Sequence, residues 1–164
     1  MSRPPLPRLL RKLRALVLDV DGVLTDGGMY YGPSGEGLKR FNVKDGLGLR
    51  LIGEAGLLVA LISGENSEIL KRRAEKLRIE SVFVGVEDKL RTLKDFAAAR
   101  GIELGEVAYV GDDLNDLAAL GAVALPIAVA DAAPEVRKAA AWVTSRRGGD
   151  GAVREVCDRI LAAR

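Results

Sequence analysis

Residues 19–27 read DVDGVLTDG and directly follow the apolar run ALVL at residues 15–18. A short aliphatic run that ends in two acids and a glycine is typical of a buried parallel strand, and open α/β sheets place their sites at the C-terminal ends of such strands. We expect Asp19 and Asp21 to point to opposite sides, so that they cannot act as an equivalent pair. The Asp19 carboxylate and the Asp21 backbone carbonyl could still face one metal ion. Alternatively, the acids only cap a turn in which Gly22 supplies a positive φ.

Two further apolar runs end in residues that can bind phosphate or metal. The run at 57–62 ends in Ser63, whose hydroxyl could bind a phosphate oxygen, although a lone serine there is more often a turn residue or a helix cap. The run at 107–110 leads into the sequence GDDLND, which contains Asp112, Asp113 and Asp116. Clustered carboxylates repel one another unless a cation compensates, and hard oxygen ligands favour Mg2+.

Lys89 stands at the start of a helical pattern between these two runs, where a single lysine would usually face solvent. The ordered set of DxDG, a serine at a strand end, a lysine and GDDxND covers residues 14 to about 125 and resembles the haloacid dehalogenase superfamily of phosphatases. The resemblance implies that Asp19 is the nucleophile and forms an aspartyl-phosphate. It implies that Asp21 protonates the departing alcohol and then activates the hydrolytic water.

The same resemblance implies a magnesium site and a phosphate site. Mg2+ would be held by Asp19, the backbone carbonyl of Asp21, and Asp112. Asp113 and Asp116 would lie behind these ligands and orient the metal-bound waters. The phosphoryl oxygens would be bound by Ser63 and Lys89.

The chemistry of phosphoryl transfer is consistent with these residue types. The transition state is loose, so the protein mainly has to position the reacting groups and neutralise charge on the equatorial oxygens. A carboxylate nucleophile needs no activating base, because aspartate is ionised above about pH 4. The chain has no histidine, which excludes Ser-His-Asp and Cys-His machinery and histidine-ligated zinc.

Composition predicts one domain that acts on a small anionic molecule. The 164 residues are 48% hydrophobic, and we expect a single domain over residues 14–164 after a loose basic tail over 1–13. The single Cys157 cannot form an internal disulfide, and neither a membrane span nor a signal peptide is evident, so we expect a cytoplasmic protein. A net charge of +2 with 4% aromatic residues offers no platform for nucleic acid but suits a small anionic sugar phosphate.

Alternating patterns predict a Rossmann-like α/β fold, a parallel sheet with helices on both faces. The predicted strands are residues 14–19, 57–62, 81–84, 106–110 and 122–129. The predicted helices are residues 45–55, 66–78, 87–100, 114–120 and 150–163. Glycines and a proline within residues 27–41, GGMYYGPSGEGLKRF, predict a protruding β-hairpin.

The spacing between motifs leaves no room for a cap domain. Residues 19–63 hold only the hairpin and one helix, and residues 89–112 hold only one helix and one strand. The chain therefore resembles the capless branch of the superfamily, whose members form tetramers in which a neighbouring subunit helps to cover the site. We expect a homotetramer with Met29, Tyr30 and Tyr31 as exposed anchors; alternatively these side chains fold back on their own core.

The sequence RGGDGAVRE at residues 147–155 is similar to the ending of capless phosphatases that act on 3-deoxy-D-manno-octulosonate 8-phosphate and on related nonulosonate 9-phosphates. Both substrates are anionic 2-keto-3-deoxy sugar acids. Arg147 and Arg154 could bind a substrate carboxylate or clamp the tail over a neighbour's site. Alternatively, the glycines only release the chain into a last amphipathic helix.

Glu65 departs from the octulosonate pattern, which tends to have arginine after the Ser/Thr-Gly pair. Together with Arg73 and Lys76, it is similar to the nonulosonate 9-phosphate type, so the sequence favours that substrate, with the octulosonate 8-phosphate as the alternative. On one helix, residues 65 and 76 lie about 16 Å apart, so both meet one substrate only if Arg73 and Lys76 come from an adjacent subunit. Alternatively, Glu65 favours a helix N-terminus and the two cations are solvated.

Two other classes of protein share some of these features. A signalling receiver domain also groups acids, a hydroxyl and a lysine at strand ends, but it places its acid pair on strand one and its phosphorylated aspartate on strand three, which is not the order here. A catalytically silent oligomerisation module with a phosphatase-like sequence is disfavoured because every catalytic position is occupied. A turnover measurement with any activated phosphate ester separates an active phosphatase from such a silent module.

Overall fold

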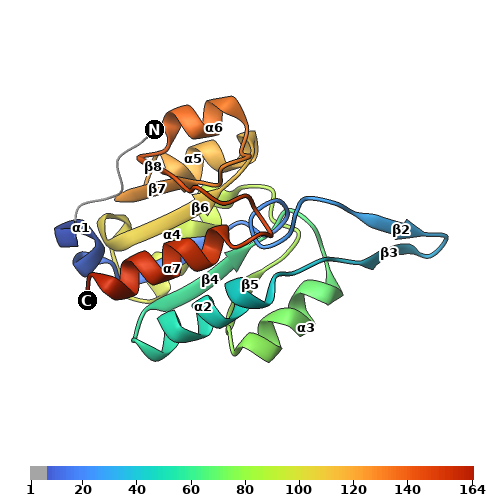
Figure 1. Ribbon diagram of the computed structural model, residues 1–164, viewed down its shortest axis with the longest axis horizontal. Coiled ribbons are helices and arrows are strands. Elements are labelled where there is room, and N and C mark those ends of the chain that lie inside the picture. The colour runs from blue at the N-terminus through green and yellow to red at the C-terminus, as the bar shows by residue number, and fades with distance from the viewer. Residues whose placement is uncertain (1–6) are drawn as a thin grey trace.

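The apolar runs of the sequence form the centre of a six-stranded parallel sheet with the strand order β5-β4-β1-β6-β7-β8 (Figure 1). The computed structural model describes residues 7–164. The strands of this sheet are β1 (Ala15–Leu18), β4 (Leu58–Ile62), β5 (Ser81–Phe83), β6 (Val107–Gly111), β7 (Leu125–Ala128) and β8 (Trp142–Val143). The predicted α/β fold class is confirmed.

Helices cover both faces of the sheet, as right-handed crossovers between parallel strands require. The helices are α1 (Pro7–Lys12), α2 (Val43–Glu54), α3 (Glu68–Leu77), α4 (Lys89–Ala99), α5 (Leu117–Leu120), α6 (Pro134–Ala139) and α7 (Ala152–Ala162), with short 3-10 turns at Leu104–Glu106 and Leu114–Asp116. Helices α2 and α7 pack side by side in front of the sheet in Figure 1, and α4 and α5 contact each other on the opposite face.

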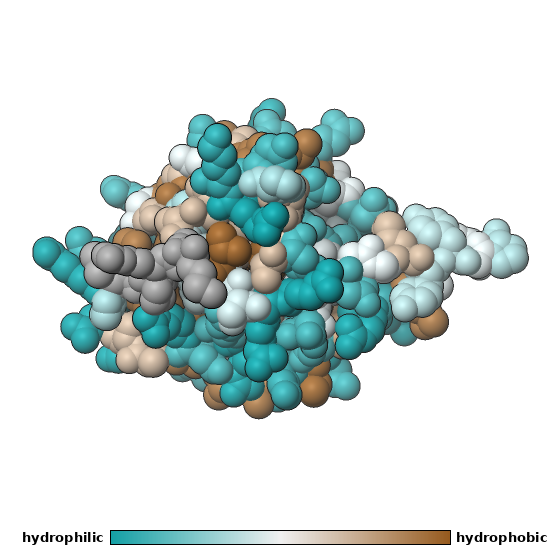
Figure 2. Space-filling model, turned by 45° about the horizontal axis from the view of Figure 1, so that its top comes forward, coloured by the Kyte–Doolittle hydropathy of each residue, from teal (hydrophilic) through white to brown (hydrophobic). Residues whose placement is uncertain are grey.

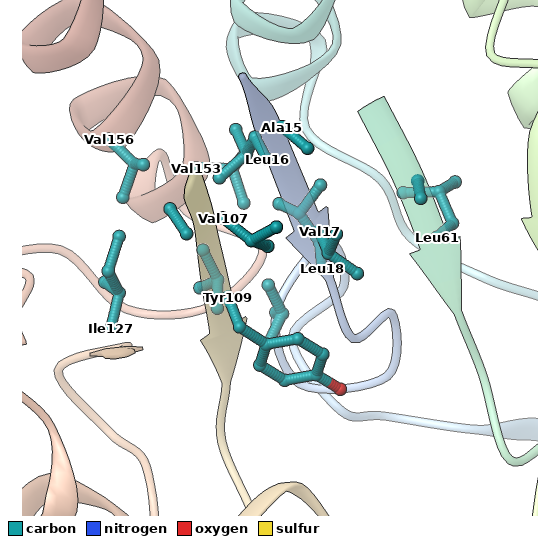
Figure 3. Packing of buried hydrophobic residues seen from close by; sticks show 14 of the residues in the cluster. Ala15, Leu16, Val17, Leu18, Leu61, Val107, Tyr109, Ile127, Val153 and Val156 are labelled. Carbon is teal, nitrogen blue, oxygen red and sulfur yellow. The ribbon is translucent and has the colours of Figure 1, made fainter. Parts of the chain in front are cut away.

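Strand β1 lies at the middle of the core. Its four residues are fully buried, and its register pairs Ala15 with Leu58 on one side and with Val107 on the other. Figure 3 shows the aliphatic side chains of β1 packed among those of the neighbouring strands and α7. Each such side chain stabilises the fold by about 1.5–3 kcal/mol, which fixes the position of the acids that follow β1.

The predicted hairpin is confirmed and stands away from the body of the molecule (Figures 1 and 2). It pairs β2 (Tyr30–Gly32) with β3 (Gly35–Leu38), and an antiparallel bridge between Thr25 and Phe41 closes its base. Met29, Tyr30 and Tyr31 are 40%, 52% and 67% exposed, so these side chains do not fold back on their own core.

The prediction of a loose tail over residues 1–13 is wrong for residues 7–13, whereas residues 1–6 lie outside the described chain. Helix α1 buries Leu10, and Leu13 is buried directly after it. The Arg11 side chain donates a hydrogen bond to the carbonyl of Ala163 at 2.6 Å. Leu10 and Leu13 are three residues apart and lie on one apolar face. Burial of this face orders the segment despite its basic composition. Across residues 7–164, no helix combines the length and the apolar character needed to cross a membrane.

The sequence analysis also missed helix α6 and strand β8. Pro134 opens α6 at its first helical position, where a missing N–H costs nothing. Strand β8 has two residues and extends the sheet beyond β7. Elements this short carry too few residues to show a period of 3.6 or of 2.

Candidate active site

The carboxyl ends of β1, β4 and β6 meet at one edge of the sheet and bring the sequence-predicted acids together. They border an open cleft of about 440 Å3. Its lining consists of Asp19, Asp21, Gly64, Glu65, Lys89, Asp112, Asp113, Leu114 and Asn115. Topology alone therefore gathers side chains that lie far apart in the sequence.

The loop after β1 turns sharply and separates its two acids. The N–H groups of Val23, Leu24 and Thr25 all donate to the carbonyl of Val20. Gly22 has a φ of 88°, and a Cβ atom there would lie 1.9 Å from Oδ2 of Asp112, so only glycine fits.

Asp19 and Asp112 face each other and are coupled through a hydrogen bond between their carboxyl groups. Burial raises the pKa of Asp19 to about 6; Asp116 adds to this rise, whereas Lys89 opposes it. Burial likewise raises the pKa of Asp112 to about 8, with the hydrogen bond to Asp19 as the next cause. Two neighbouring carboxyls whose pKa values are both raised by burial indicate a position where a cation would relieve their repulsion.

Lys89 supplies one positive charge to this cluster. Its Nζ lies 2.8 Å from Oδ1 of Asp19 and 2.8 Å from Oδ1 of Asp116. Asp88 caps α4 by accepting the N–H of Arg91, and this cap fixes Lys89 as the first helical residue. The lysine side chain is almost fully buried, so its partners are held closely.

Asp116 is fully buried, and its carboxylate accepts four hydrogen bonds. Oδ1 accepts from Lys89 and from the hydroxyl of Tyr109, each at 2.8 Å. Oδ2 accepts from the backbone N–H groups of Asp112 at 3.0 Å and Asp113 at 3.3 Å. Figure 3 shows the Tyr109 hydroxyl directed away from the aliphatic cluster. The sequence analysis missed Tyr109, because within an apolar run it has the pattern of a core residue.

The acids offer a set of oxygens that suits a hard cation. One carboxylate oxygen from each of Asp19, Asp112 and Asp116 lies within 4.8 Å of the others. Because the oxygens of Asp116 already accept four hydrogen bonds, Asp19 and Asp112 could act as metal ligands and Asp116 could orient them. Asp113 lines the cleft, and its carboxylate accepts the N–H of Leu114 at 2.7 Å.

Ser63 is buried beside Asp21 and does not line the cleft in this structure. Its hydroxyl donates to Oδ2 of Asp21 at 3.4 Å and accepts the N–H of Glu65 at 3.1 Å. The structure therefore places Ser63 next to Asp21, while Lys89 contacts Asp19.

Lys39, at the end of the hairpin, is a neighbour of Asp21 that the sequence analysis missed. Its Nζ lies 2.5 Å from Oδ1 of Asp21 and 2.6 Å from Oε1 of Glu36. Burial lowers the pKa of Lys39, but the hydrogen bonds and charges of the two acids outweigh this and raise it. No sequence signal could have identified this lysine, because a single cation in a polar hairpin usually faces solvent.

Of the three residues that suggested a nonulosonate substrate, only Glu65 lines the cleft. Arg73 lies 5.5 Å from the centre of the Phe41 ring and donates to the carbonyl of Asn42 at 3.4 Å. Lys76 is exposed on α3. Within one chain Arg73 is therefore held by its contacts with Phe41 and Asn42, and Lys76 faces solvent.

Residues 147–149 pack against the acid loop of the same chain. Arg147 is exposed and pairs with Asp131 at 3.3 Å, and it does not line the cleft. A Cβ atom on Gly148 would lie 1.7 Å from the carbonyl oxygen of Gly22, so the backbones of the tail and the loop are in direct contact. Gly149 has a φ of 67°, which favours glycine.

Comparison with known proteins agrees with this geometry. The family model of haloacid dehalogenase-like hydrolases matches residues 54–156. The 3-deoxy-D-manno-octulosonate 8-phosphate phosphatase of Yersinia pestis is 45% identical over 151 residues, which cover 92% of this chain and 81% of that protein.

Two solved structures share the fold of this chain. The octulosonate 8-phosphate phosphatase of Moraxella catarrhalis, in complex with a magnesium ion, a phosphate ion and 3-deoxy-D-manno-octulosonate (KDO), is 39% identical with a TM-score of 0.93, covering 96% of this chain and 91% of that one. The cobalt-bound phosphatase of Haemophilus influenzae is 42% identical with a TM-score of 0.92, covering 94% and 91% of the two chains.

Proposed function

The chain belongs to the haloacid dehalogenase-like hydrolases, and we propose that it hydrolyses the phosphomonoester of 3-deoxy-D-manno-octulosonate 8-phosphate. It is a phosphoric monoester hydrolase. The observation that carries the choice of substrate is the similarity, over 92% of the chain, to a phosphatase with this activity. Asp19, Asp21 and Lys89 line one cleft, which supports hydrolysis of a phosphate ester as the class of reaction.

The preference for a nonulosonate 9-phosphate that the sequence suggested is not supported. It depended on three side chains, and Arg73 and Lys76 do not line the cleft of their own chain. Identity of 42–45% along nearly the whole chain to octulosonate 8-phosphate phosphatases outweighs a single departure at Glu65. The alternative substrate of the sequence analysis is therefore the one proposed.

Asp19 is proposed to attack the phosphorus and form an aspartyl-phosphate. Its carboxylate lines the cleft, and the Lys89 ammonium lies 2.8 Å away. Once charge on the neighbouring acids is balanced, this carboxylate is ionised at neutral pH without a separate base. Lys89 is placed to contact a phosphoryl oxygen and to offset negative charge that develops during transfer.

Asp21 is proposed to protonate the leaving oxygen and then to accept a proton from the attacking water. It lines the same cleft as Asp19, but its two oxygens accept from Lys39 and Ser63, whereas Asp19 pairs with Lys89. Two carboxyls in different surroundings can take two different roles, one as nucleophile and one as acid and base.

The residues that would hold Mg2+ are the carboxylates of Asp19 and Asp112 with the backbone carbonyl of Asp21. The fit rests on the close approach of the acid oxygens, which lie within 4.8 Å of one another, and on a donor set made only of oxygen. When bound, Mg2+ neutralises charge on the transferring phosphoryl group. Asp116 and Tyr109 keep Lys89 and the Asp112 backbone in place around it.

We also propose that the chain forms a homotetramer. The hairpin, the start of α2 and the cleft rim expose large apolar side chains, including Tyr31 at 67% and Val43 at 79%. An open cleft gives a phosphoryl-transfer reaction little protection from water, and a neighbouring subunit would supply the missing wall. The cytoplasmic location expected from the sequence likewise stays a prediction.

The test compares kcat/KM for the octulosonate 8-phosphate and the nonulosonate 9-phosphate in the presence of Mg2+. We expect the 8-phosphate to be preferred by about tenfold or more, the discrimination that one or two pocket contacts give. Glu65→Ala probes the rim of the cleft, and Glu68→Ala on the exposed start of α3 is the matched control. A preference for the 9-phosphate that Glu65→Ala abolishes would overturn the substrate assignment. No release of phosphate from either ester would instead favour the silent oligomerisation module.

A further inference from the structure

The end of the hairpin carries a lysine whose side chain turns inward, unlike those of its neighbours. Strand β3 ends at Leu38, which is 66% exposed, and the next residue, Lys39, has a side chain only 1% exposed. The bridge between Thr25 and Phe41 ties the base of the hairpin to the end of the acid loop. This connection brings a residue of the hairpin against the carboxylate of Asp21.

The contacts of Lys39 join the acid loop, the hairpin and α3. Its ammonium lies 2.5 Å from Oδ1 of Asp21 and 2.6 Å from Oε1 of Glu36. Glu36 is fixed in turn, because the hydroxyl of Ser67, the N-cap of α3, donates to its Oε2 at 3.3 Å. The remaining oxygen of Asp21 accepts from Ser63. Both oxygens of Asp21 are therefore held, one from β4 and one from the hairpin.

Because the Lys39 side chain is buried, its charge must be paired. A buried ammonium is stable only when paired and hydrogen-bonded, and two carboxylates that share it would repel each other without it. Asp21 lines the cleft, whereas Lys39 is not among the residues that line it. Lys39 can act on the reaction through the position of the Asp21 carboxylate, without contact to the substrate.

We propose that Lys39, braced by Glu36, is a positioning residue that holds Asp21 where it can transfer a proton to the leaving oxygen. The inference rests on the proposed phosphatase function and on the role of Asp21 in it. Proton transfer requires hydrogen-bond reach between the carboxyl and the ester oxygen, and small displacements cost large factors in rate. Departure of a sugar alkoxide needs this proton, whereas departure of nitrophenolate does not.

The experiment measures the first turnover, with enzyme in excess and Mg2+ present, on octulosonate 8-phosphate and on p-nitrophenyl phosphate. Lys39→Met keeps the length of the side chain and removes its charge, and Lys39→Arg restores the charge. Lys71→Met, on the exposed face of α3, is the matched control. First-turnover rates exclude the later hydrolysis of the aspartyl-phosphate, in which Asp21 acts on both substrates alike.

We expect Lys39→Met to slow release of the sugar by about 100-fold and release of nitrophenolate by about threefold or less, the difference that general acid catalysis supplies. Lys39→Arg should recover about tenfold of the loss on the sugar phosphate, and Lys71→Met should change neither rate. Equal losses on both substrates, or no loss on either, would overturn the proposal and leave Lys39 as a hairpin anchor. If Lys39→Met does not fold, Lys39→Arg decides the question. The proposal then requires that the first-turnover rate of Lys39→Arg falls more on the sugar phosphate than on the aryl ester. If the unaltered protein hydrolyses neither ester, the proposed function fails instead.

Discussion

Replacing Asp116 by asparagine tests whether the buried carboxylate, with its four hydrogen bonds, organises the site. Its two oxygens accept from Lys89, Tyr109 and the N–H groups of Asp112 and Asp113. Asparagine keeps one acceptor oxygen, so two of the four donors face an amide NH2 in either orientation. At about 1–3 kcal/mol for each stranded buried donor, the free energy of unfolding should fall by about 2–6 kcal/mol.

Urea denaturation of Asp116→Asn measures this loss as a shift of the midpoint at constant slope. Tyr109→Phe is the graded control, because it removes one donor and leaves the carboxylate with three, and we expect a loss of about 1 kcal/mol. Typical domains are stable by only about 5–15 kcal/mol, so the asparagine variant should be studied at low temperature. A loss below about 1 kcal/mol in Asp116→Asn would refute the assignment of this residue as the organising acceptor.

Three further predictions follow from the site and the hairpin. Asp19→Asn should abolish phosphate release while leaving the free energy of unfolding within about 1 kcal/mol of that of the unaltered protein, and full activity in this variant would end the nucleophile assignment. Burial raises the pKa of Asp19 to about 6 and that of Asp112 to about 8. Without metal, the folded protein therefore keeps protons that the unfolded chain releases near pH 4. Its free energy of unfolding should fall as the pH rises from about 4 to 8. Mg2+ competes with those protons, so the increase in Tm that it causes should be larger at pH 8 than at pH 6; an increase independent of pH would contradict the ligand assignment. Sedimentation equilibrium should show a species about four times the chain mass of 17.5 kDa, and Tyr31→Lys should shift it toward the monomer, whereas a fully active monomer would exclude the tetramer.

The strands and the positions of the acids could be predicted because parallel strands are buried on both faces. Such strands read as unbroken apolar runs, and the residue that follows each run lies at the functional edge of the sheet. Asp19, Ser63 and Asp112 follow β1, β4 and β6 in this way. The different surroundings of Asp19 and Asp21 could not be predicted in this way, because residues i and i+2 of an extended strand share a face. They arise from the sharp turn directly after β1, where three N–H groups donate to the carbonyl of Val20.

Contacts between elements could not be predicted, because they depend on how the hairpin and the tail dock. Lys39 looks like a solvated cation until the bridge between Thr25 and Phe41 turns the hairpin base toward Asp21. The same limit applies to Leu10, whose burial depends on the surface against which α1 packs. The substrate was the feature that the sequence predicted least well, since a few exposed side chains carry little information about a site that another subunit would complete.

The contact of Gly148 and Gly149 with the acid loop has a consequence for how the protein is made. The N–H of Gly149 donates to the carbonyl of Val23, and Gly148 lies against the backbone of Gly22. These partners come from opposite ends of the described chain, and contacts of such long sequence separation form slowly. During synthesis the loop after β1 emerges from the ribosome well before the segment that braces it, since domains are built from the N-terminus onward. We therefore expect a nascent chain arrested before residue 148 to hold its catalytic aspartates in an incomplete loop, and activity to appear only after the last helix has been translated.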